Sequence, residues 1–234
     1  PYPSNDLNEM TKAFAAKYRS RYKDEPESHG AKGYDQAMLL INAMEKVYPN
    51  ITGEAIAAEL HKTCGFKGLQ GEFCYDENGE GIKDCFIGTV KGGQLVAYTT
   101  PAKPAEPTKA AAAPATGEPI LIGWIAPKSG TNAILGEWDE RGVLLAFEAK
   151  NAAGGIQGRP LKLIQADDEA DPTKAVNLAQ KLITQDKVVA AMACTNSTTT
   201  LAVVPVFQRY KIPHVTAALN LQITNMGSST CSGI

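Results

Sequence analysis

The sequence predicts an α/β fold: a doubly wound, mainly parallel sheet with helices on both faces, which gives three αβα layers. Two observations predict it. After residue 120, short apolar runs alternate with segments of helical periodicity, which is typical of parallel strands joined by crossover helices. Before residue 100, the chain has helical apolar stripes but few central strands, so it can cover a sheet better than it can build one.

The first segment, residues 1 to 100, begins with three predicted helices. The first spans about 5–22 with Asn5 as its N-cap, the second about 31–47, and the third about 52–63 with Thr52 as its opening residue. Three short strands follow, and the first two flank a turn at Asp76 to Gly79: residues 73–75, 85–87 and 94–98.

Residues 101 to 119 form a predicted linker. Five Pro and seven Ala fall in these nineteen positions, and no hydrophobic periodicity survives there. Proline removes backbone donors and favours extended backbone, so we expect a solvated, semi-rigid spacer. Each flanking segment lacks what the other supplies, and we therefore expect residues 1–100 and 120–234 to form one domain.

The second segment, residues 120 to 234, alternates strands and helices. The run from Ile120 to Ile125 is continuously apolar, as expected of a strand buried on both faces. Asp171-Pro172 predicts a helix start with Pro at the first helical position, and Ser197 or Thr198 is the expected cap of a later helix. The remaining predicted elements are a helix at 133–151 and strands at 161–166, 188–192 and 212–215.

Composition excludes several classes of protein. The 234-residue chain has a net charge of -2, which argues against nucleic-acid binding, and no apolar run is long enough for a membrane helix. The chain opens with Pro1 in polar sequence, so we expect no signal peptide in it. None of the three histidines is spaced with another as a ligand pair, and no serine has a nucleophile-elbow setting. We therefore expect that the protein is not an enzyme and that it binds no metal or cofactor.

The five cysteines leave at least one thiol without an intramolecular partner. Cys64, Cys74 and Cys85 are spaced by ten and eleven residues, which fits no metal or redox motif. The favoured interpretation is that they are small, half-buried apolar residues; the alternative is one disulfide among the three.

Two hydroxyl-rich loops follow predicted strands and lead into helices. One contains Ser129, and the other places five hydroxyls in six positions from Thr195 to Thr200. Free amides at a helix start favour anions such as carboxylate, and the loops of parallel strands meet at one edge of the sheet. Helix capping explains one hydroxyl in each loop but not five. We therefore expect a polar pocket for a small anion-bearing ligand.

Other motifs are better explained as turns. No glycine fingerprint or Walker signature follows the first strand after the linker. Asp76 to Gly79 has part of a calcium-loop pattern but lacks its final glutamate, so a hairpin turn is favoured. The acidic cluster from Asp167 to Asp171 is interpreted as a solvated turn in which Asp171 caps the next helix.

A family resemblance emerges on both sides of the linker. After it, the sequence resembles the amino-terminal part of branched-chain amino-acid binding proteins, the type I periplasmic binding proteins of ABC importers. The matching sequence motifs are Ser129-Gly130, Asn151 to Gly158, Asp167-Asp168, Asp171-Pro172 and Ile212-Pro213. The stretch before the linker is similar to the carboxyl-terminal part of the same family, through Gly33 to Ala37, Gly68 to Gly71 and Asp76 to Gly79.

The resemblance implies a circularly permuted first lobe, flavodoxin-like in fold, with the second lobe absent. It implies that the loop at Cys194 to Ser197 holds a ligand carboxylate, with Thr195 as the key hydroxyl. The residues implied for the site, counting those where this chain departs from the family pattern, are Ser129, Leu135, Cys194, Thr195, Asn196, Ser197, Ala217, Ala218, Leu219 and His29.

The partners implied by the resemblance are an amino acid or related carboxylate, bound weakly by the isolated lobe, and an importer permease, in a periplasmic or other extracytoplasmic setting. Two alternatives stay open. The chain is an engineered or excised scaffold without retained binding, or it is one half of a split or domain-swapped assembly, completed as a homodimer or by a second-lobe partner.

Overall fold

The structure, a computed structural model, is organised around one parallel sheet. The residues that it describes are 9–83, 88–91, 94–97, 115–193, 195–218, 220–226 and 230–231. The predicted N-cap Asn5, the predicted strand 85–87 and most of the linker lie outside them.

The parallel sheet has the strand order β10-β9-β8-β6-β7 among the described residues, and every pairing in it is parallel. This confirms the predicted doubly wound fold with a parallel sheet. The strands are β6 (Ile120–Ala126), β7 (Leu161–Asp167), β8 (Ala190–Ala193), β9 (His214–Val215) and β10 (Thr230–Cys231).

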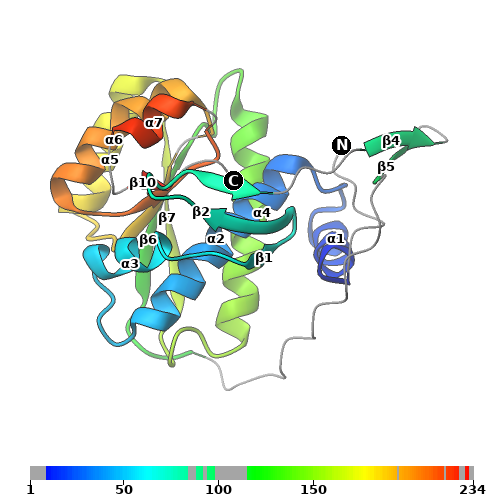
Figure 1. Ribbon diagram of the computed structural model, residues 1–234, viewed down its shortest axis with the longest axis horizontal. Coiled ribbons are helices and arrows are strands. Elements are labelled where there is room, and N and C mark those ends of the chain that lie inside the picture. The colour runs from blue at the N-terminus through cyan, green and yellow to red at the C-terminus, as the bar shows by residue number, and fades with distance from the viewer. Residues whose placement is uncertain are drawn as a thin grey trace.

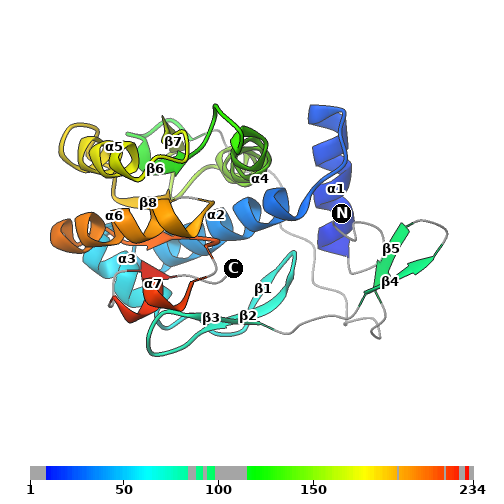
Figure 2. The same cartoon turned by 90° about the horizontal axis from the view of Figure 1, so that it is seen from above.

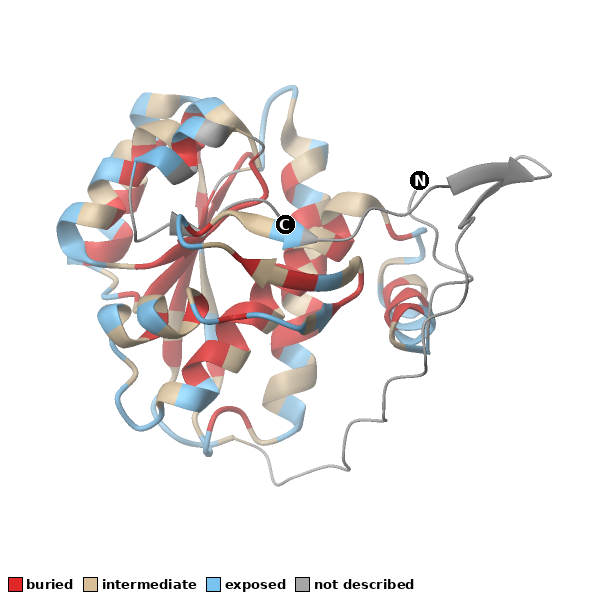
Figure 3. Ribbon diagram, in the orientation of Figure 1, coloured by how far each residue is buried: buried red, intermediate tan, exposed pale blue. Residues whose placement is uncertain are grey.

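The central strand β6 is buried on both faces, as its apolar run predicts. Ile122 and Trp124 belong to the core that packs against the helices of one face, whereas Ile125 packs against those of the other. Successive side chains of a strand point to opposite faces, so a continuous apolar run fills both cores. Figure 3 shows the resulting buried centre between two layers of amphipathic helices.

Helices cover both faces of this sheet, and one face combines helices of both segments. Figure 2 shows α2 and α4 on one side of the strands and α5 and α6 on the other. The helices are α1 (Glu9–Tyr22), α2 (Ser28–Val47), α3 (Gly53–Leu60), α4 (Ala133–Ala152), α5 (Pro172–Thr184), α6 (Ser197–Tyr210) and α7 (Leu221–Asn225). The helix α2 comes from the first segment and α4 from the second, and both contribute to one core with β6.

The helices α2 and α4 pack through glycines. A Cβ at Gly142 would lie 1.8 Å from the carbonyl oxygen of Gly30, and one at Gly33 would lie 2.2 Å from that of Asp139. Such distances leave no room for any side chain. Beyond the glycines, Lys150 near the end of α4 is paired with Glu45 near the end of α2, so the two helices run in the same direction. Both therefore start at the same edge of the sheet.

Antiparallel strands of the first segment form two smaller sheets. The order β1-β2-β3 includes a hairpin at the expected turn, Asp76 to Gly79, but its second strand begins at Gly81 and not at residue 85 as predicted. A separate hairpin lies outside the body in both views (Figures 1 and 2). The strands are β1 (Phe66–Gly68), β2 (Gly71–Tyr75), β3 (Gly81–Lys83), β4 (Gly88–Lys91) and β5 (Gln94–Ala97).

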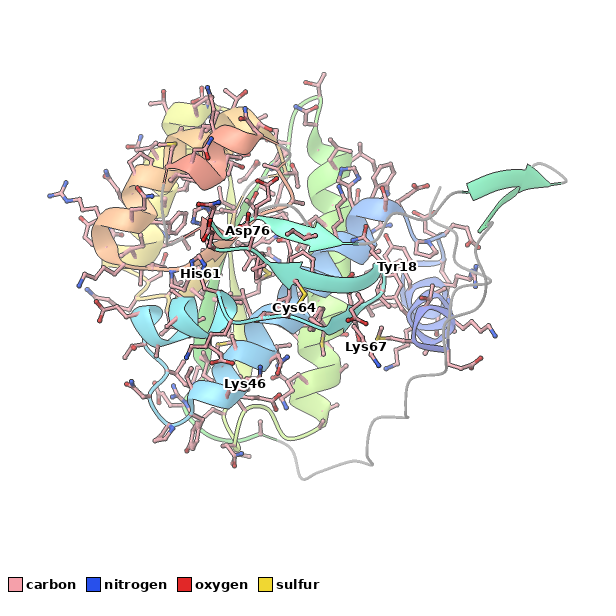
Figure 4. All side chains as sticks on the ribbon, viewed as in Figure 1. Tyr18, Lys46, His61, Cys64, Lys67 and Asp76 are labelled. Atoms are coloured by element: carbon pink, nitrogen blue, oxygen red, sulfur yellow. A yellow bond between two sulfur atoms is a disulfide. The ribbon has the colours of Figure 1, made fainter. Side chains whose placement is uncertain are left out.

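The cysteine interpretation was wrong for two residues. Cys64 and Cys74 form a disulfide, so the alternative of one bridge among the three cysteines is confirmed (Figure 4). The turn between α3 and β1 folds back along β2 and brings the two residues together, a juxtaposition that residue spacing alone does not reveal. Cys85 lies outside the described residues.

Several predicted boundaries were displaced. The helix α2 begins at Ser28 instead of residue 31, because tertiary packing outweighs the low helix propensity of His29 and Gly30. The strand expected from residue 188 begins at Ala190, since the Val188 amide donates to Leu182 O at the end of α5 (3.1 Å). The strands β1 and β10 were not foreseen, because three or two residues are too short for a periodicity.

The end of the linker differs from a free spacer. The amide of Gly117 donates to Gly158 O (2.9 Å), and the Arg159 guanidinium donates to Glu118 O (2.9 Å). Residues 117 and 118 are therefore attached to the turn that precedes β7, which fixes the entry into β6.

The glycine contact between α2 and α4 gives a stability prediction. Gly142→Ala should lower the free energy of unfolding by about 1–3 kcal/mol, because overpacking a tight contact outweighs the gain in helix propensity of about 1 kcal/mol. Urea denaturation of both proteins measures the change. Ile134→Ala, at an exposed side chain near the start of the same helix, is the control and should change stability little. A higher urea midpoint for Gly142→Ala would contradict the packing described here.

Candidate functional site

The carboxyl ends of four neighbouring strands bring the predicted loops together. Ile125 of β6 is in register with Ala193 of β8, and Ala126 of β6 with Asp167 of β7. On the other side of β8, Met192 pairs with Val215 of β9. The loops after β6, β7, β8 and β9 therefore leave the sheet at one edge, as expected, and this edge is where parallel sheets bind ligands.

Capping uses part of the hydroxyl-rich loop after β8. The N-cap of α6 is Asn196, not Ser197 or Thr198 as predicted: its side-chain oxygen accepts from the Thr199 amide (2.9 Å) and the Thr199 hydroxyl (2.8 Å). Asparagine at this position fills the same role as a hydroxyl. The Thr200 hydroxyl donates to the Asn196 carbonyl oxygen (2.7 Å). These contacts fix the helix start.

The hydroxyl of Thr195 remains without a partner. Its oxygen is buried from solvent and makes no hydrogen bond, although the residue as a whole is only half-buried. Ser197, the first residue of α6, is also half-buried, and Thr198 is exposed. A buried hydroxyl without a partner costs about 1–3 kcal/mol, so Thr195 has unused hydrogen-bonding capacity beside the free amides of a helix start.

The hydroxyl of Ser129 is engaged within the protein. It donates to Asp167 (2.8 Å), and the Lys128 amide donates to the other carboxylate oxygen of Asp167 (2.8 Å). Burial alone would raise the pKa of Asp167, but these hydrogen bonds and that of the Glu169 amide lower it. Asp167 thus stays ionised and ties the loop after β6 to the end of β7. The structure makes Ser129 a loop anchor.

The loop after β9 presents mainly backbone to the edge. Ala217 and Ala218 are buried, and the Ala218 amide donates to the Thr216 hydroxyl (3.1 Å). The same hydroxyl lies 3.4 Å from that of Thr200, which joins this loop to the start of α6. Cys194 and Leu219 lie outside the described residues.

Aromatic and apolar side chains lie beside the edge on the α2 and α4 side. The half-buried rings of His29 and Trp138 have centroids 6.2 Å apart and an interplanar angle of 32°. Leu135 is half-buried, one turn before Trp138 on α4. Burial lowers the pKa of His29, with a further contribution from Lys32, so its ring is neutral at pH 7. Sequence reasoning missed Trp138, because only the glycine contact between the helices places it next to His29.

The buried carboxyl of Asp139 attaches the start of α4 to the sheet. Asp139 accepts a hydrogen bond from the Trp124 indole (2.8 Å), and burial raises the pKa of its carboxyl to about 7. The bond connects α4 to β6, and so holds the helix that carries Leu135 and Trp138 on the sheet.

A second buried ionisable group lies under the loop after β9. His214 is fully buried, neither ring nitrogen has a hydrogen-bond partner, and its ring stacks on Phe207 at a centroid distance of 4.8 Å. Burial lowers the pKa of His214 to about 3. The residue is neutral in the folded protein across the physiological range.

The described residues contain no cluster of three or more side chains that could hold a metal ion. Within the same part of the chain, none of the helices has both the length and the apolar character that a bilayer crossing requires.

Comparison with known proteins identifies similar sequences. A family model described as "Periplasmic binding protein" matches residues 1–94 and 119–233. An amino acid binding protein from Pseudomonas aeruginosa is 39% identical over 111 residues, which are 47% of this chain and 30% of that protein. Leu/Ile/Val-binding protein homolog 7 from Brucella abortus is 32% identical over 120 residues, or 51% of this chain and 30% of that protein. The chain thus spans under a third of either relative.

Solved structures are similar over about half of the chain. A branched-chain amino acid transporter substrate binding protein from Streptococcus pneumoniae, in complex with isoleucine, has 28% identity and a TM-score of 0.48 and covers 50% of this chain and 34% of that chain. A leucine binding protein from Thermotoga maritima has 27% identity and a TM-score of 0.46, with 48% of this chain and 32% of that chain covered.

The buried histidine gives a pH prediction. Its folded pKa of about 3 lies below the unfolded value of about 6.5, so its contribution to stability is complete above pH 6.5 and is lost as the pH falls. His214→Phe removes this loss. The stability of the variant relative to wild type should rise by about 2 kcal/mol between pH 7 and pH 5.

Urea denaturation of both proteins at the two pH values measures this difference. Because the measured quantity is the difference in stability between variant and wild type, the titration of Asp139 and of all other groups that the two proteins share cancels. Val204→Ala, at a buried residue of α6 without an ionisable group, is the control and should change stability by the same amount at both pH values. A stability difference that is independent of pH would contradict a neutral, unpartnered His214.

Proposed function

The chain belongs to the periplasmic binding protein family, and we propose that it is a ligand-binding lobe of an amino-acid-type solute-binding protein of an ABC importer. In this proposal the lobe catalyses no reaction. It captures an amino acid or related carboxylate outside the cytoplasm and, as part of a complete binding protein, delivers it to a permease.

The unpartnered hydroxyl of Thr195 is the observation that carries the proposal. It lies at the start of α6, beside Ser197, at the carboxyl edge of the sheet. Hydroxyls and free amides at a helix start are suitable donors for a carboxylate. The neighbouring hydroxyls are already used as donors: those of Thr199 and Thr200 donate to Asn196, and that of Ser129 donates to Asp167. We therefore assign the carboxylate to the loop at residues 194 to 197, with the backbone of Ala217 and Ala218 closing the other side.

The organisation of the lobe is a second part of the proposal. Residues 1–100 and 120–234 make one lobe, in which the order of the two family segments is permuted and residues 101–119 join the old termini. The mixed core of α2, α4 and β6 supports a single unit. The family model matches both segments, residues 1–94 and 119–233, which supports the assignment of both to the same family.

A single lobe should bind its ligand weakly. A carboxylate on an open edge stays in contact with water, so each hydrogen bond contributes only about 0.5–1.5 kcal/mol. Two or three such bonds must offset an association cost of at least about 4 kcal/mol. The sum is near zero, whereas a dissociation constant of 1 mM requires about −4 kcal/mol, so these polar contacts cannot give the single lobe an affinity tighter than millimolar.

Thr195→Val tests the carboxylate site. It should weaken leucine binding by about 2- to 12-fold, the equivalent of one lost hydrogen bond. The same change should stabilise the free protein, because valine removes a buried hydroxyl that has no partner. Titration of the isotope-labelled chain with leucine, followed by nuclear magnetic resonance, measures affinities in the millimolar range, and urea denaturation measures stability.

Thr198→Val is the matched control, because Thr198 is exposed in the first turn of α6, three residues after Thr195, and its replacement should affect neither quantity. Equal leucine affinity in Thr195→Val and wild type would remove Thr195 from the site. Micromolar affinity for leucine in the monomeric wild-type chain would refute the proposal of a lone lobe.

Hydrogen exchange tests whether the two segments form one unit. The slowest amides of α2 in the first segment and of β6 in the second should exchange with the same free energy, because both elements open only in global unfolding. Two distinct free energies, with α2 opening independently of β6, would show that the segments are separate units.

A further inference from the structure

We propose that the disulfide between Cys64 and Cys74 is a reducible clasp that holds the β1–β2 hairpin, residues 66–75, on α2. A dithiol opens the clasp by attack on Cys64, and the hairpin then detaches locally while the parallel sheet stays folded. The inference goes beyond the proposed function, since it involves no residue of the carboxylate site.

The hairpin is fixed at its two ends. At its turn, the Asp35 carboxylate of α2 accepts hydrogen bonds from the amides of Leu69 (2.7 Å) and Gln70 (3.2 Å). At its open end, the disulfide joins β2 to the turn after α3 (Figure 4), and the Tyr75 amide donates to Thr63 O in the same turn (2.9 Å). The clasp is the covalent part of this attachment.

The middle of the hairpin packs less closely on α2. A cavity lies between them and is lined by Leu39 of α2 and by Phe66 and Phe73 of the hairpin. Atoms that line a void lose the contacts that a filled interior supplies. The side-chain amide nitrogen of Gln70, which lines the same cavity, is buried without a hydrogen-bond partner, and this lowers stability further. The two ends therefore carry much of the attachment.

The two cysteines differ in their access to an attacking thiolate. Cys64 is exposed, whereas Cys74 is half-buried on β2. The Gly65 amide donates to Cys74 Sγ (3.4 Å). A hydrogen bond to sulfur favours the thiolate, and a more stable thiolate leaves faster in thiol–disulfide exchange. Attack on Cys64, with Cys74 as the leaving group, is therefore the favoured direction.

The dithiol supplies the electrons and protons of the reaction. One of its thiolates bonds to Cys64 Sγ, the bond between the two cysteine sulfurs breaks, and Cys74 leaves as a thiolate that takes up a proton. The second thiolate of the dithiol then attacks the first dithiol sulfur, which closes the disulfide of the dithiol and releases Cys64 to take up the other proton. The protein gains two electrons, and the dithiol loses two.

Reduction should loosen the hairpin more than the lobe. The bridge joins residues that are 10 apart in the sequence, and removing such a cross-link raises the open population of the hairpin roughly 100-fold through the restored chain entropy. Phe73 and Tyr75 leave the core when the hairpin opens, but the contacts among α2, α4 and β6 remain.

Hydrogen exchange of the intact chain, with and without the small dithiol dithiothreitol, tests the clasp. On reduction, the amides of Leu69 and Tyr75 should lose roughly 100-fold in protection, whereas the slowest amides of β6 should change by less than about 2-fold. Unchanged protection of the hairpin would overturn the clasp. An equal loss in the hairpin and in β6 would also overturn it, because the bridge would then hold the whole lobe.

The double variant Cys64→Ser, Cys74→Ser is the matched control, because the chain has three other cysteines whose reduction must be separated from that of the bridge. The variant should show the exchange of reduced wild type, and dithiothreitol should not change its hairpin further. A hairpin as protected as in oxidised wild type would overturn the clasp. A variant that does not fold would overturn local detachment.

Trapping with a monothiol tests the direction of attack. After brief exposure to glutathione and quenching with iodoacetamide, mass spectrometry should find glutathione on Cys64 and the alkyl label on Cys74. Glutathione mainly on Cys74, or equally on both, would overturn the assignment of Cys64 as the attacked residue.

Discussion

The close approach of α2 and α4 is the constraint on which the rest of the structure depends. With glycine at positions 30, 33 and 142, backbone meets backbone, and the two helices run in the same direction along one face of the sheet. The contact joins segments that are separated by the linker in the sequence, closes the core over β6 and brings the start of α2 to the carboxyl edge. Bulkier residues would separate the helices and open the core and the site together.

The proposed carboxylate site consists of polar groups that the fold does not use. Capping and loop anchoring engage Asn196, Thr199, Thr200 and Ser129, and those bonds make the loops rigid. The Thr195 hydroxyl is left over, held in place by neighbours that are themselves bonded. A donor preorganised in this way loses little entropy when a ligand arrives, whereas a flexible donor loses more. The free protein is less stable because this buried hydroxyl has no partner, and a ligand that pairs with it would remove that cost.

The sequence alone could predict the features that local patterns encode. The apolar run of β6, the Pro172 helix start and the hairpin turn at Asp76 each have a local physical cause and were found where expected. The features that depend on long-range contacts could not be predicted. Spacing does not pair Cys64 with Cys74, and nothing local places Trp138 beside His29. For the site, the edge and its loops were predictable, but which hydroxyls remain free was not.

Two buried ionisable groups, one on each face of the sheet, oppose each other in their dependence on pH. His214 is held neutral, so acid below about pH 6.5 favours the unfolded chain. Asp139 has a folded pKa that is raised to about 7, so a rise in pH above its unfolded pKa of about 4 favours the unfolded chain. Between these limits the two slopes have opposite signs and cancel to a large extent. Over this pH range the two groups together therefore contribute little net pH dependence to stability, although each alone would contribute a clear slope.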